Sequence, residues 1–310
     1  VARHRIPTNQ HRTPNRKSIA GEAGANLITG CDNVFMIVHL VDGTYELYRQ
    51  HFGSAARHSS ASETAASVGV LGSTIALLEA GATHIAVATD HVIESFRNDL
   101  WDGYKTSDGM EDEILSQVAV IEKVLEKLGV TVWPMVKYEA DDALASGARV
   151  AGANRAVRQV RLLTPDKDLG QCVQGKRIVQ VDRRNDTIID EDGVRAKFGV
   201  GPESIADWLG LVGDTADGFP GLSGWGAKSA STVLAKFKHI EDIPDDHASW
   251  DVGVRGAEKL ATTLREQRDL ANLFKKIATT VDTVKVGEVE DWEWQGPRKG
   301  FEKAFDEIGA

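Results

Sequence analysis

The sequence predicts an α/β fold, an open and doubly wound sheet in which mostly parallel strands alternate with helices. Two observations support this prediction. Nearly continuous apolar runs of strand length, such as 34–41 and 84–89, are typical of strands buried on both faces of a parallel sheet. The segment 111–128 instead repeats its apolar residues at the helical period of 3.6 residues. Strands and helices that follow one another in this way build a doubly wound sheet.

The remaining elements are expected in a regular order along the chain. Glycine, proline and polar clusters separate the apolar segments, so each segment has recognisable ends. The last two strands look like a short antiparallel pair, and the region after them is expected to be helical. In chain order, the expected elements are a strand at 34–41, a helix near 63–80, a strand at 84–89, a helix at 111–128, strands at 130–136, 161–164, 178–182 and 187–190, and helices at 202–211 and 227–237.

Acidic side chains follow four of these strands. In doubly wound sheets the loops after the strands gather along one edge and form the ligand crevice, so these acids are expected to meet there. A single acid at the end of a strand is more often a turn or N-cap residue, but the coincidence of several at one edge favours a metal site. The acids are Asp42, Asp90, Glu139, Asp141, Asp142, Asp166 and Asp168.

The densest group is 139–142, where three carboxylates fall within four residues. On a helix, Glu139 and Asp142 would share a face. One interpretation is that these acids only complement the dipole of a helix N-terminus. The other is that they bind a hard divalent cation, which prefers oxygen ligands. The strand-end acids exceed what one Mg²⁺ needs, so we expect two metal positions, the usual arrangement for phosphate ester hydrolysis.

Composition places few limits on function. The chain has 310 residues and a net charge of −10, which argues against general electrostatic binding of nucleic acid but allows a local basic track. It contains no apolar run long enough to span a membrane and no apolar signal segment. Cys31 and Cys172 have no metal or disulfide spacing, so a reducing, cytoplasmic setting is expected. Residues 1–20 carry five basic residues and no acid, which predicts a flexible extension that either touches phosphates or is only solvated.

Basic and aromatic residues follow the second strand. The segment 96–105 contains Arg97, Tyr104 and Lys105, and Arg49 follows the first strand. Beside a metal site these cations would attract phosphates, and Tyr104 could stack on a base. Each of them taken alone is more often a solvated surface residue.

A glycine-rich turn connects the two C-terminal helices. Asp214 and Asp217 add two carboxylates there, either as turn residues or as part of a second metal position. With the N-terminus of the next helix, the turn offers bare N–H groups that bind a DNA phosphate of any sequence. The alternative is an ordinary turn between helices. The residues expected to bind DNA here are Gly221, Gly224, Gly226 and Lys228.

Four motifs in order resemble the bacterial 5′ nuclease (flap endonuclease) family, which includes the 5′-3′ exonuclease domain of bacterial DNA polymerase I. They are Val41-Asp42-Gly43, Glu139-Ala140-Asp141-Asp142, Asp166-Lys167-Asp168-Leu169 and the run from Gly213 to Gly221. The resemblance covers roughly residues 34–280. It implies a PIN-like core, a helical arch over the site and a C-terminal helix-three-turn-helix subdomain for duplex DNA.

The resemblance also implies a role for each matching residue. The nine acids, from Asp42 to Asp217, would be inner- and outer-sphere ligands of two or more Mg²⁺ or Mn²⁺ ions. Arg97 and Lys105 would contact the scissile phosphate with Arg49 as a basic neighbour, and Tyr104 would stack on a base. The turn at 221–228 would grip the duplex and could hold K⁺. The implied activity is 5′-3′ exonuclease and flap endonuclease cleavage in DNA replication and repair, with removal of RNA primers or flaps.

The implied partners are 5′ flaps, nicked or gapped duplexes, 5′ single-strand ends and RNA–DNA hybrids, cut by a monomeric, stand-alone nuclease in the bacterial cytoplasm at the nucleoid. No membrane partner is expected. We expect a basic extension at 1–30, a nuclease core with arch at 31–197, and the DNA-binding region with C-terminal helices at 198–310.

One departure from the family pattern is an acid, Asp108, where a further basic residue is usual after Lys105, so the arch is less cationic. Gly218, where the family commonly has Asn, is expected to matter little. Trp292, Trp294, Phe301 and Phe305 are expected to pack on the core. The alternatives are a small-molecule phosphohydrolase on a similar sheet and a DNA-binding module with a degenerate site.

Overall fold

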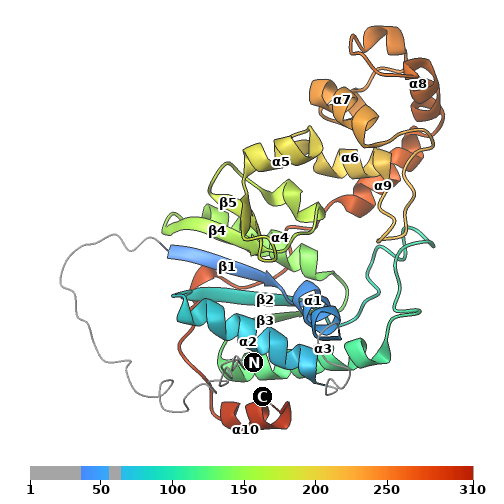
Figure 1. Ribbon diagram of the computed structural model, residues 1–310. Helices are drawn as coiled ribbons and strands as arrows, with labels where there is room; N and C mark the ends of the chain where they lie inside the picture. The colour runs from blue at the N-terminus through green and yellow to red at the C-terminus, as the bar shows by residue number, and fades with distance from the viewer. Residues whose placement is uncertain (1–35, 56–63, 310) are drawn as a thin grey trace, which may run out of the picture. The chain divides into compact units, whose positions relative to one another are not determined.

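The computed structural model describes residues 36–55 and 64–309. Within them a six-stranded sheet has the order β3-β2-β1-β4-β5-β6, with β1 to β5 parallel and β6 antiparallel to β5. The predicted doubly wound, mostly parallel sheet is confirmed (Figure 1). The predicted basic extension 1–30 lies outside the described residues. The strands are β1 (Met36–Asp42), β2 (His84–Asp90), β3 (Thr131–Met135), β4 (Val157–Leu163), β5 (Ile178–Asp182) and β6 (Thr187–Ile189).

Helices cover both faces of the sheet, which explains the apolar character of its strands. On β1, Leu40 packs into a cluster with α4, whereas Val41 points into a second cluster with the remaining sheet helices. Side chains of a strand alternate between the two faces, so both must be apolar. The helices are α4 (Ala140–Ala153) on the first face, and α1 (Gly43–Ala55), α2 (Ala65–Glu79), α3 (Asp112–Leu128) and α10 (Phe301–Glu307) on the second.

The chain leaves β1 in both directions across the sheet, because β2 and β4 are both its neighbours. Such a reversal of strand order opens a crevice at the carboxyl ends of the strands. Asp42 and Asp90 are the last residues of β1 and β2, and the segment after β4 runs into Asp166 and the 3-10 helix η1 (Asp168–Cys172). The topology therefore brings these acids to one edge.

The region after β6 has a hydrophobic cluster of its own. Leu209, Phe219, Trp250 and Phe274 lie at its centre and are buried. The predicted helices at 202–211 and 227–237 are present, the first as a 3-10 turn followed by α6. The elements are α5 (Glu191–Phe198), η2 (Pro202–Ser204), α6 (Ile205–Val212), α7 (Ala227–Phe237), η3 (Ile240–Asp242), η4 (His247–Ser249), α8 (Ala257–Glu266) and α9 (Arg268–Ala278).

The segment 91–111 differs from the expected helical arch. All of its residues are described, and they form turns without a helix. The segment is tied to the glycine-rich turn: Trp101 Nε1 donates to the Gly218 carbonyl at 3.1 Å, and the Lys105 N–H donates to the Asp217 carbonyl at 3.1 Å. Tyr104 is buried in the helical cluster. These inward contacts hold the segment in an irregular conformation.

The C-terminal aromatic residues return to the sheet, as predicted. Trp292, in the 3-10 helix η5 (Val289–Trp292), packs with α4, and its ring meets that of Trp133 at 5.2 Å between centroids. Trp294, Phe301 and Phe305 pack on the opposite cluster. The predicted division of the chain at 197/198 stays a prediction.

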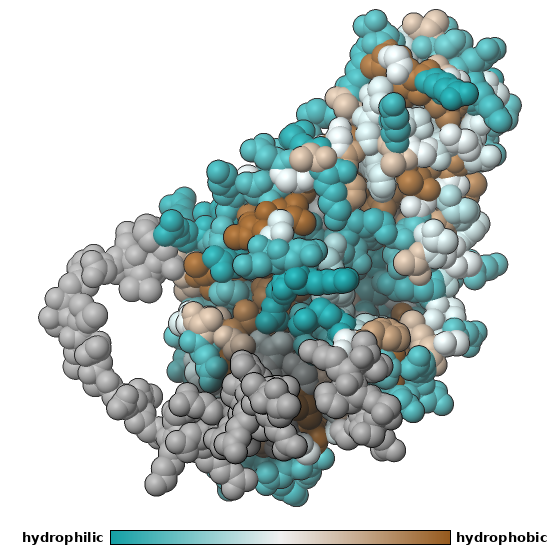
Figure 2. All heavy atoms as spheres, viewed as in Figure 1, coloured by the Kyte–Doolittle hydropathy of each residue, from teal (hydrophilic) through white to brown (hydrophobic). Residues whose placement is uncertain are grey.

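The surface of the described chain is mainly hydrophilic on the face that Figure 2 shows. Its large exposed hydrophobic residues, as far as the structure describes them, are Phe52 on α1, Val136 just after β3 and Ile188 on β6, so they come from separate parts of the chain. Scattered apolar side chains of this kind need no partner. Among the described helices, none combines the length and the apolar character that a membrane crossing requires.

Candidate metal centre

Asp42 occupies the centre of the carboxyl edge of the sheet. One of its oxygens accepts the Tyr45 N–H at 2.8 Å, and the other accepts the Thr164 hydroxyl at 2.9 Å. Gly43 lets the chain pass directly into α1, because a Cβ at this position would lie 2.8 Å from the carbonyl oxygen of Ala88. The glycine after Asp42 is therefore required by the close approach of α1 to β2.

The acids at this edge repel one another. Burial, assisted by the neighbouring charges of Asp90 and Asp166, raises the pKa of Asp42 to about 7 against the lowering effect of its hydrogen bonds. Burial also raises the pKa of Asp141 far above its ordinary value, assisted by Asp166 and Asp42. Asp90 shows the same direction with burial as its main cause. Such shifts mark carboxylates that lack compensating positive charge.

Three further acids form a compact triad. Asp168, Asp214 and Asp217 each place one carboxylate oxygen within 4.8 Å of the other two. Within the described chain, Oδ1 of Asp168 is buried and has no hydrogen-bond partner. Burial and the charges of Asp166, Asp217 and Asp214 raise the pKa of Asp168 well above its ordinary value. An unpaired buried oxygen among like charges is what a bound cation would satisfy.

These residues fit hard divalent cations. Every donor is a carboxylate, the ligand that Mg²⁺ and Mn²⁺ prefer. The acids divide into a group at the strand ends and the triad, and Asp166 interacts electrostatically with both groups. We name the acids that could hold metal the clustered acids: Asp42, Asp90, Asp141, Asp166, Asp168, Asp214 and Asp217.

Glu139 differs from the clustered acids because both of its carboxylate oxygens already accept hydrogen bonds or ion pairs from the protein. Oε1 accepts from Ser95 at 2.6 Å and from Arg97 at 3.0 Å, Oε2 lies 2.8 Å from Lys105, and the Tyr104 hydroxyl donates at 3.0–3.1 Å. Burial acts to raise the pKa of Glu139, but Lys105 and Arg97 outweigh it and the pKa is lowered. A carboxylate with four donor groups has no lone pair left for a metal.

Asp142 is also fully engaged within the protein, and its predicted role as an inner- or outer-sphere metal ligand stays a prediction. It receives two 2.8 Å contacts from Arg97, the Val281 N–H at 2.8 Å and the Glu139 N–H at 3.0 Å. Glu139 is the extended N-cap that precedes α4, it forms a capping box with Asp142, and both carboxylates contact Arg97. We call Glu139 and Asp142 the paired acids.

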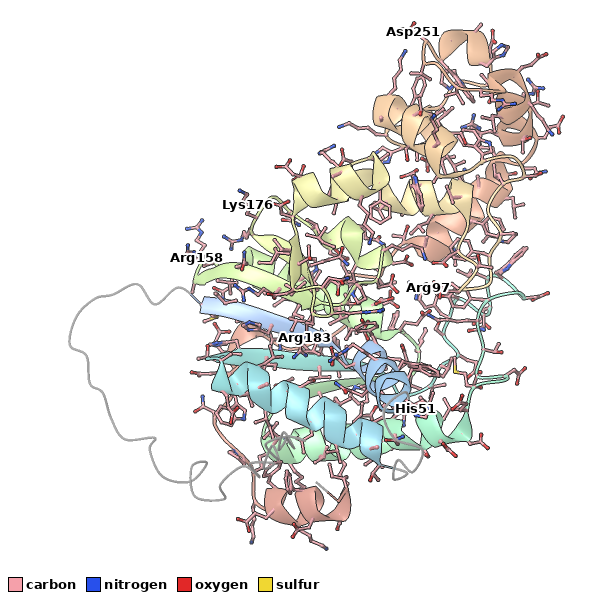
Figure 3. The ribbon with its side chains drawn as sticks, in the orientation of Figure 1. His51, Arg97, Arg158, Lys176, Arg183 and Asp251 are labelled. Atoms are coloured by element: carbon pink, nitrogen blue, oxygen red, sulfur yellow. The ribbon has the colours of Figure 1, made fainter. Side chains whose placement is uncertain are left out.

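Arg97 holds the paired acids and does not face a substrate. It is 3% exposed, and Figure 3 shows it in the connection that follows β2. Besides Glu139 and Asp142, it donates to the carbonyls of Ile277 at 2.8 Å and Thr279 at 3.1 Å. The predicted contact of Arg97 with the scissile phosphate is therefore wrong, because every face of the guanidinium is occupied within the protein.

The buried position of Tyr104 also differs from the prediction that its ring stacks on a base. Its side chain is buried, with 4% exposed, and its ring packs in the helical cluster. A base cannot stack on a ring that the protein already covers, so the predicted stacking role is wrong. Lys105 stays beside the clustered acids: its ammonium lies 2.8 Å from Glu139 and 3.0 Å from Asp217.

Arg49 lies on α1 and shares a buried carboxylate with another arginine. Its guanidinium is 2.5 Å from Glu46, and Arg183 of the β5–β6 turn approaches the same carboxylate at 3.4 Å. Figure 3 shows Arg183 beside α1. Glu46 is completely buried, so it fixes the position of Arg49.

The glycine-rich turn serves first to bring backbone segments together. Gly221 has a φ of 67°, and a Cβ there would lie 2.4 Å from the Gly213 nitrogen. The Gly226 N–H is taken by the Ser229 hydroxyl at 3.0 Å. Gly224 and Lys228 are exposed at the start of α7. Their contact with DNA stays a prediction.

Sequence reasoning gave no role to three polar residues of the site. Lys167 forms an ion pair with Asp214. Thr164 donates to Asp42, and Ser95 donates to Glu139. A signal for Lys167 was present, because a lysine between two acids is well placed to neutralise acids that gather around it.

A doubly wound sheet with buried acids at its carboxyl edge, continued by a helical region, defines an α/β protein with a cluster of carboxylates suited to divalent cations. A family model for the N-terminal resolvase-like domain of 5′-3′ exonucleases matches residues 37–199. A model for their C-terminal SAM fold matches residues 200–300. The chain belongs to the 5′-3′ exonuclease family.

Individual relatives agree with this assignment. The chain is 30% identical over 248 residues to a 5′-3′ exonuclease of Aquifex aeolicus, which covers 79% of this chain and 83% of that protein. It is 33% identical over 258 residues to DNA polymerase I of Pseudomonas aeruginosa, covering 80% of this chain. The match spans only 27% of that polymerase.

Solved structures share the fold. The T5 D15 protein co-crystallized with metal ions has a TM-score of 0.65 at 17% identity, covering 88% of this chain and 100% of that one. The catalytic core of Rad2 in complex with DNA substrate has a TM-score of 0.54 at 15% identity, covering 89% and 92%. At these identities the likeness shows the fold alone.

Proposed function

We propose that this chain is a structure-specific 5′ nuclease that hydrolyses DNA phosphodiester bonds by 5′-3′ exonuclease and flap endonuclease cleavage. The observation that carries the proposal is the set of clustered acids, in which the pKa values of Asp42, Asp141 and Asp168 are raised and Asp168 keeps an unpaired buried oxygen, in a member of the 5′-3′ exonuclease family. Bound divalent ions supply an activated water and stabilise charge on the reacting phosphate.

The residues of the chain divide the work around such ions. The clustered acids would hold the ions, as Mg²⁺ or Mn²⁺, in two positions. Lys105, which lies between Glu139 and Asp217, places a positive charge next to the reacting phosphate. Arg97 and the paired acids keep Lys105 and α4 in position without meeting the substrate.

The helical region would hold the duplex. The exposed start of α7, with Gly224 and Lys228, offers N–H groups and a cation to a phosphate of any sequence, and this turn could hold K⁺. The substrates we propose are 5′ flaps, nicked or gapped duplexes, 5′ single-strand ends and RNA–DNA hybrids. A monomer acting in replication and repair in the bacterial cytoplasm, at the nucleoid, fits this chemistry.

The test is product mapping on labelled DNA. A 5′-flap duplex, a nicked duplex and a single strand are incubated with Mg²⁺, with Mn²⁺ and with a chelator, and a small phosphomonoester serves as the control substrate. We expect metal-dependent cleavage near the branch or from the 5′ end, and no turnover of the phosphomonoester. Cleavage that persists in the chelator, or turnover of the small ester alone, would contradict the proposal.

A further inference from the structure

Two lysines contact the acid triad. The Lys105 ammonium lies 3.0 Å from Asp217, and the Lys167 ammonium pairs with Asp214. Asp168, the third member, keeps a buried oxygen without a hydrogen-bond partner in the described chain. The triad is therefore partly neutralised by the protein's own cations at the positions where a metal ion needs carboxylate oxygens.

The two lysines are held very differently. Lys105 has a second carboxylate, Glu139, at 2.8 Å, and its ammonium also lies 5.6 Å from the centre of the Tyr104 ring. The ion pairs of the described residues give Lys167 one carboxylate only, Asp214, and its side chain is 32% exposed. Lys167 can thus leave its partner by rotating a flexible stem toward solvent, whereas Lys105 cannot leave without breaking several contacts.

An ammonium and a divalent cation compete for the same carboxylate. A metal ion that takes Asp214 must displace Lys167 or accept a like charge close by. The displaced ammonium would then stand at the carboxyl edge of the sheet, next to the exposed Asp166, where the substrate backbone would pass. A phosphate is the group that this freed cation would bind.

We propose that Lys167 is an exchangeable cation of the triad: it pairs with Asp214 in the metal-free protein and moves to a DNA phosphate when a divalent ion binds. The inference rests on the proposed function. It assigns to Lys167 a role in phosphate binding that is coupled to metal occupancy. Removing the lysine should then affect the two ligands in opposite directions.

The test is Lys167→Ala in the full chain, with two binding measurements and no turnover. Mn²⁺ binding to the DNA-free protein, followed by the loss of the free-ion EPR signal, should tighten by about 3- to 10-fold because a competing charge is gone. Binding of a 5′-flap duplex in Ca²⁺, with the DNA checked to be intact, should weaken by about 3- to 10-fold. The slope of log affinity against log salt should fall by about one, as for the loss of one phosphate contact.

Lys176→Ala is the matched control, because Lys176 is an exposed lysine of the same β4–β5 connection and, among the described residues, forms no ion pair with an acid of the triad (Figure 3). It should leave Mn²⁺ binding unchanged. Lys167→Gln, which keeps most of the side-chain volume, repeats both measurements in case the alanine variant folds poorly.

Weaker or unchanged Mn²⁺ binding in the Lys167 variants would overturn the proposal. If Lys167 only supported the structure, its removal would not tighten metal binding. Unchanged DNA affinity and salt slope would overturn it as well. The Mn²⁺ measurement needs no nuclease activity, so failure of the proposed function would be recognised separately, by the absence of cleavage in the wild-type protein.

Discussion

Within the four residues 139–142, the acids differ in their hydrogen bonding, and two of them differ in the direction in which their pKa values shift. Glu139 and Asp142 are saturated by donors, whereas Asp141 between them belongs to the clustered acids. Burial opposes ionisation in both groups, yet the pKa of Glu139 is lowered and that of Asp141 is raised. The difference lies in positive charge: Arg97 and Lys105 contact Glu139, whereas Asp141 has no ion pair among the described residues and is proposed to bind a metal ion.

The paired acids and the clustered acids therefore have different roles: the first hold the site in position, and the second serve its chemistry. The paired acids cap α4 and connect it, through Arg97, to the end of α9 at Ile277 and Thr279. The clustered acids carry negative charge that Lys105 and Lys167 compensate only in part. An acid of the first group should matter for stability, and an acid of the second group for activity.

The largest expected effect is the loss of activity in Asp141→Asn. This change removes a metal ligand, so the rate of DNA cleavage in Mg²⁺ should fall by at least about 10³-fold. Thermal unfolding in the absence of metal should be unchanged or shifted upward, because a repelling buried charge is gone. Single-turnover cleavage and a melting curve measure the two effects. Retained cleavage together with a lower melting temperature would place Asp141 with the paired acids.

The second prediction is that Asp142→Asn, unlike Asp141→Asn, lowers the stability of the protein. The buried guanidinium of Arg97 loses its bidentate carboxylate, and breaking such a pair costs about 3–5 kcal/mol of the free energy of unfolding. Denaturant unfolding measures this loss. Arg195→Met, which removes an exposed i,i+4 pair with Glu191, is the control and should have no measurable effect. An Asp142 variant as stable as the wild type would show that the pair does not hold the fold.

The clustered acids could be predicted from the sequence because their convergence follows from topology. Apolar runs indicate parallel strands, and parallel strands bring their carboxyl ends to one edge, so Asp42, Asp90 and Asp166 had to meet. The same logic says nothing about which acid of 139–142 receives a hydrogen bond, because that depends on partners far away in the chain. Arg97 lies 45 residues before Asp142, and its carbonyl acceptors lie 180 and 182 residues after it.

The burial of single side chains was the second feature of the site that could not be predicted from the sequence. Arg97 and Tyr104 occur in a segment rich in polar residues, which gives no periodic apolar pattern to show that they point inward. Their positions are set by the glycine-rich turn, which Trp101 and Lys105 contact through hydrogen bonds to Gly218 and Asp217. Contacts between two irregular segments have no signature in local sequence.

The third prediction concerns pH and metal. In the folded protein the pKa of Asp42 is about 7, against an ordinary value of 3.8, and Asp90, Asp141 and Asp168 shift in the same direction. Between these values the folded state binds protons that the unfolded chain does not. The four acids therefore raise the free energy of unfolding as the pH falls from about 8 to about 5. Burial lowers the pKa of His39 to about 4 and also lowers that of His84, so these two histidines act in the opposite direction over the same range, and the larger number of shifted acids sets the expected net rise. Glu139 has a lowered pKa, so its stabilising contribution is lost only as the pH falls below its ordinary value of 4.5.

Melting curves of the metal-free protein should show this rise as an increase of about 3 °C or more. At pH 8, Mg²⁺ or Mn²⁺ should raise the melting temperature, because the ions bind the folded state, and should flatten its dependence on pH. Removal of the ions with a chelator should restore the dependence. A melting temperature that falls steadily from about pH 8 to about pH 5 without metal would mean that the acids are not clustered as described.

The smallest expected effect is that of Tyr104→Phe, which tests the boundary of the paired group. The hydroxyl donates to both oxygens of Glu139, and its loss leaves a buried carboxylate with one donor fewer. The free energy of unfolding should fall by about 1 kcal/mol. DNA affinity in Ca²⁺ should not change, since the ring lies inside the helical cluster. If the ring instead stacked on a base and its hydroxyl had no structural role, Tyr104→Phe would leave the free energy of unfolding unchanged, because phenylalanine stacks as tyrosine does. Unchanged stability in denaturant would therefore show that Glu139 does not need this donor, and would weaken the separation between the paired and the clustered acids.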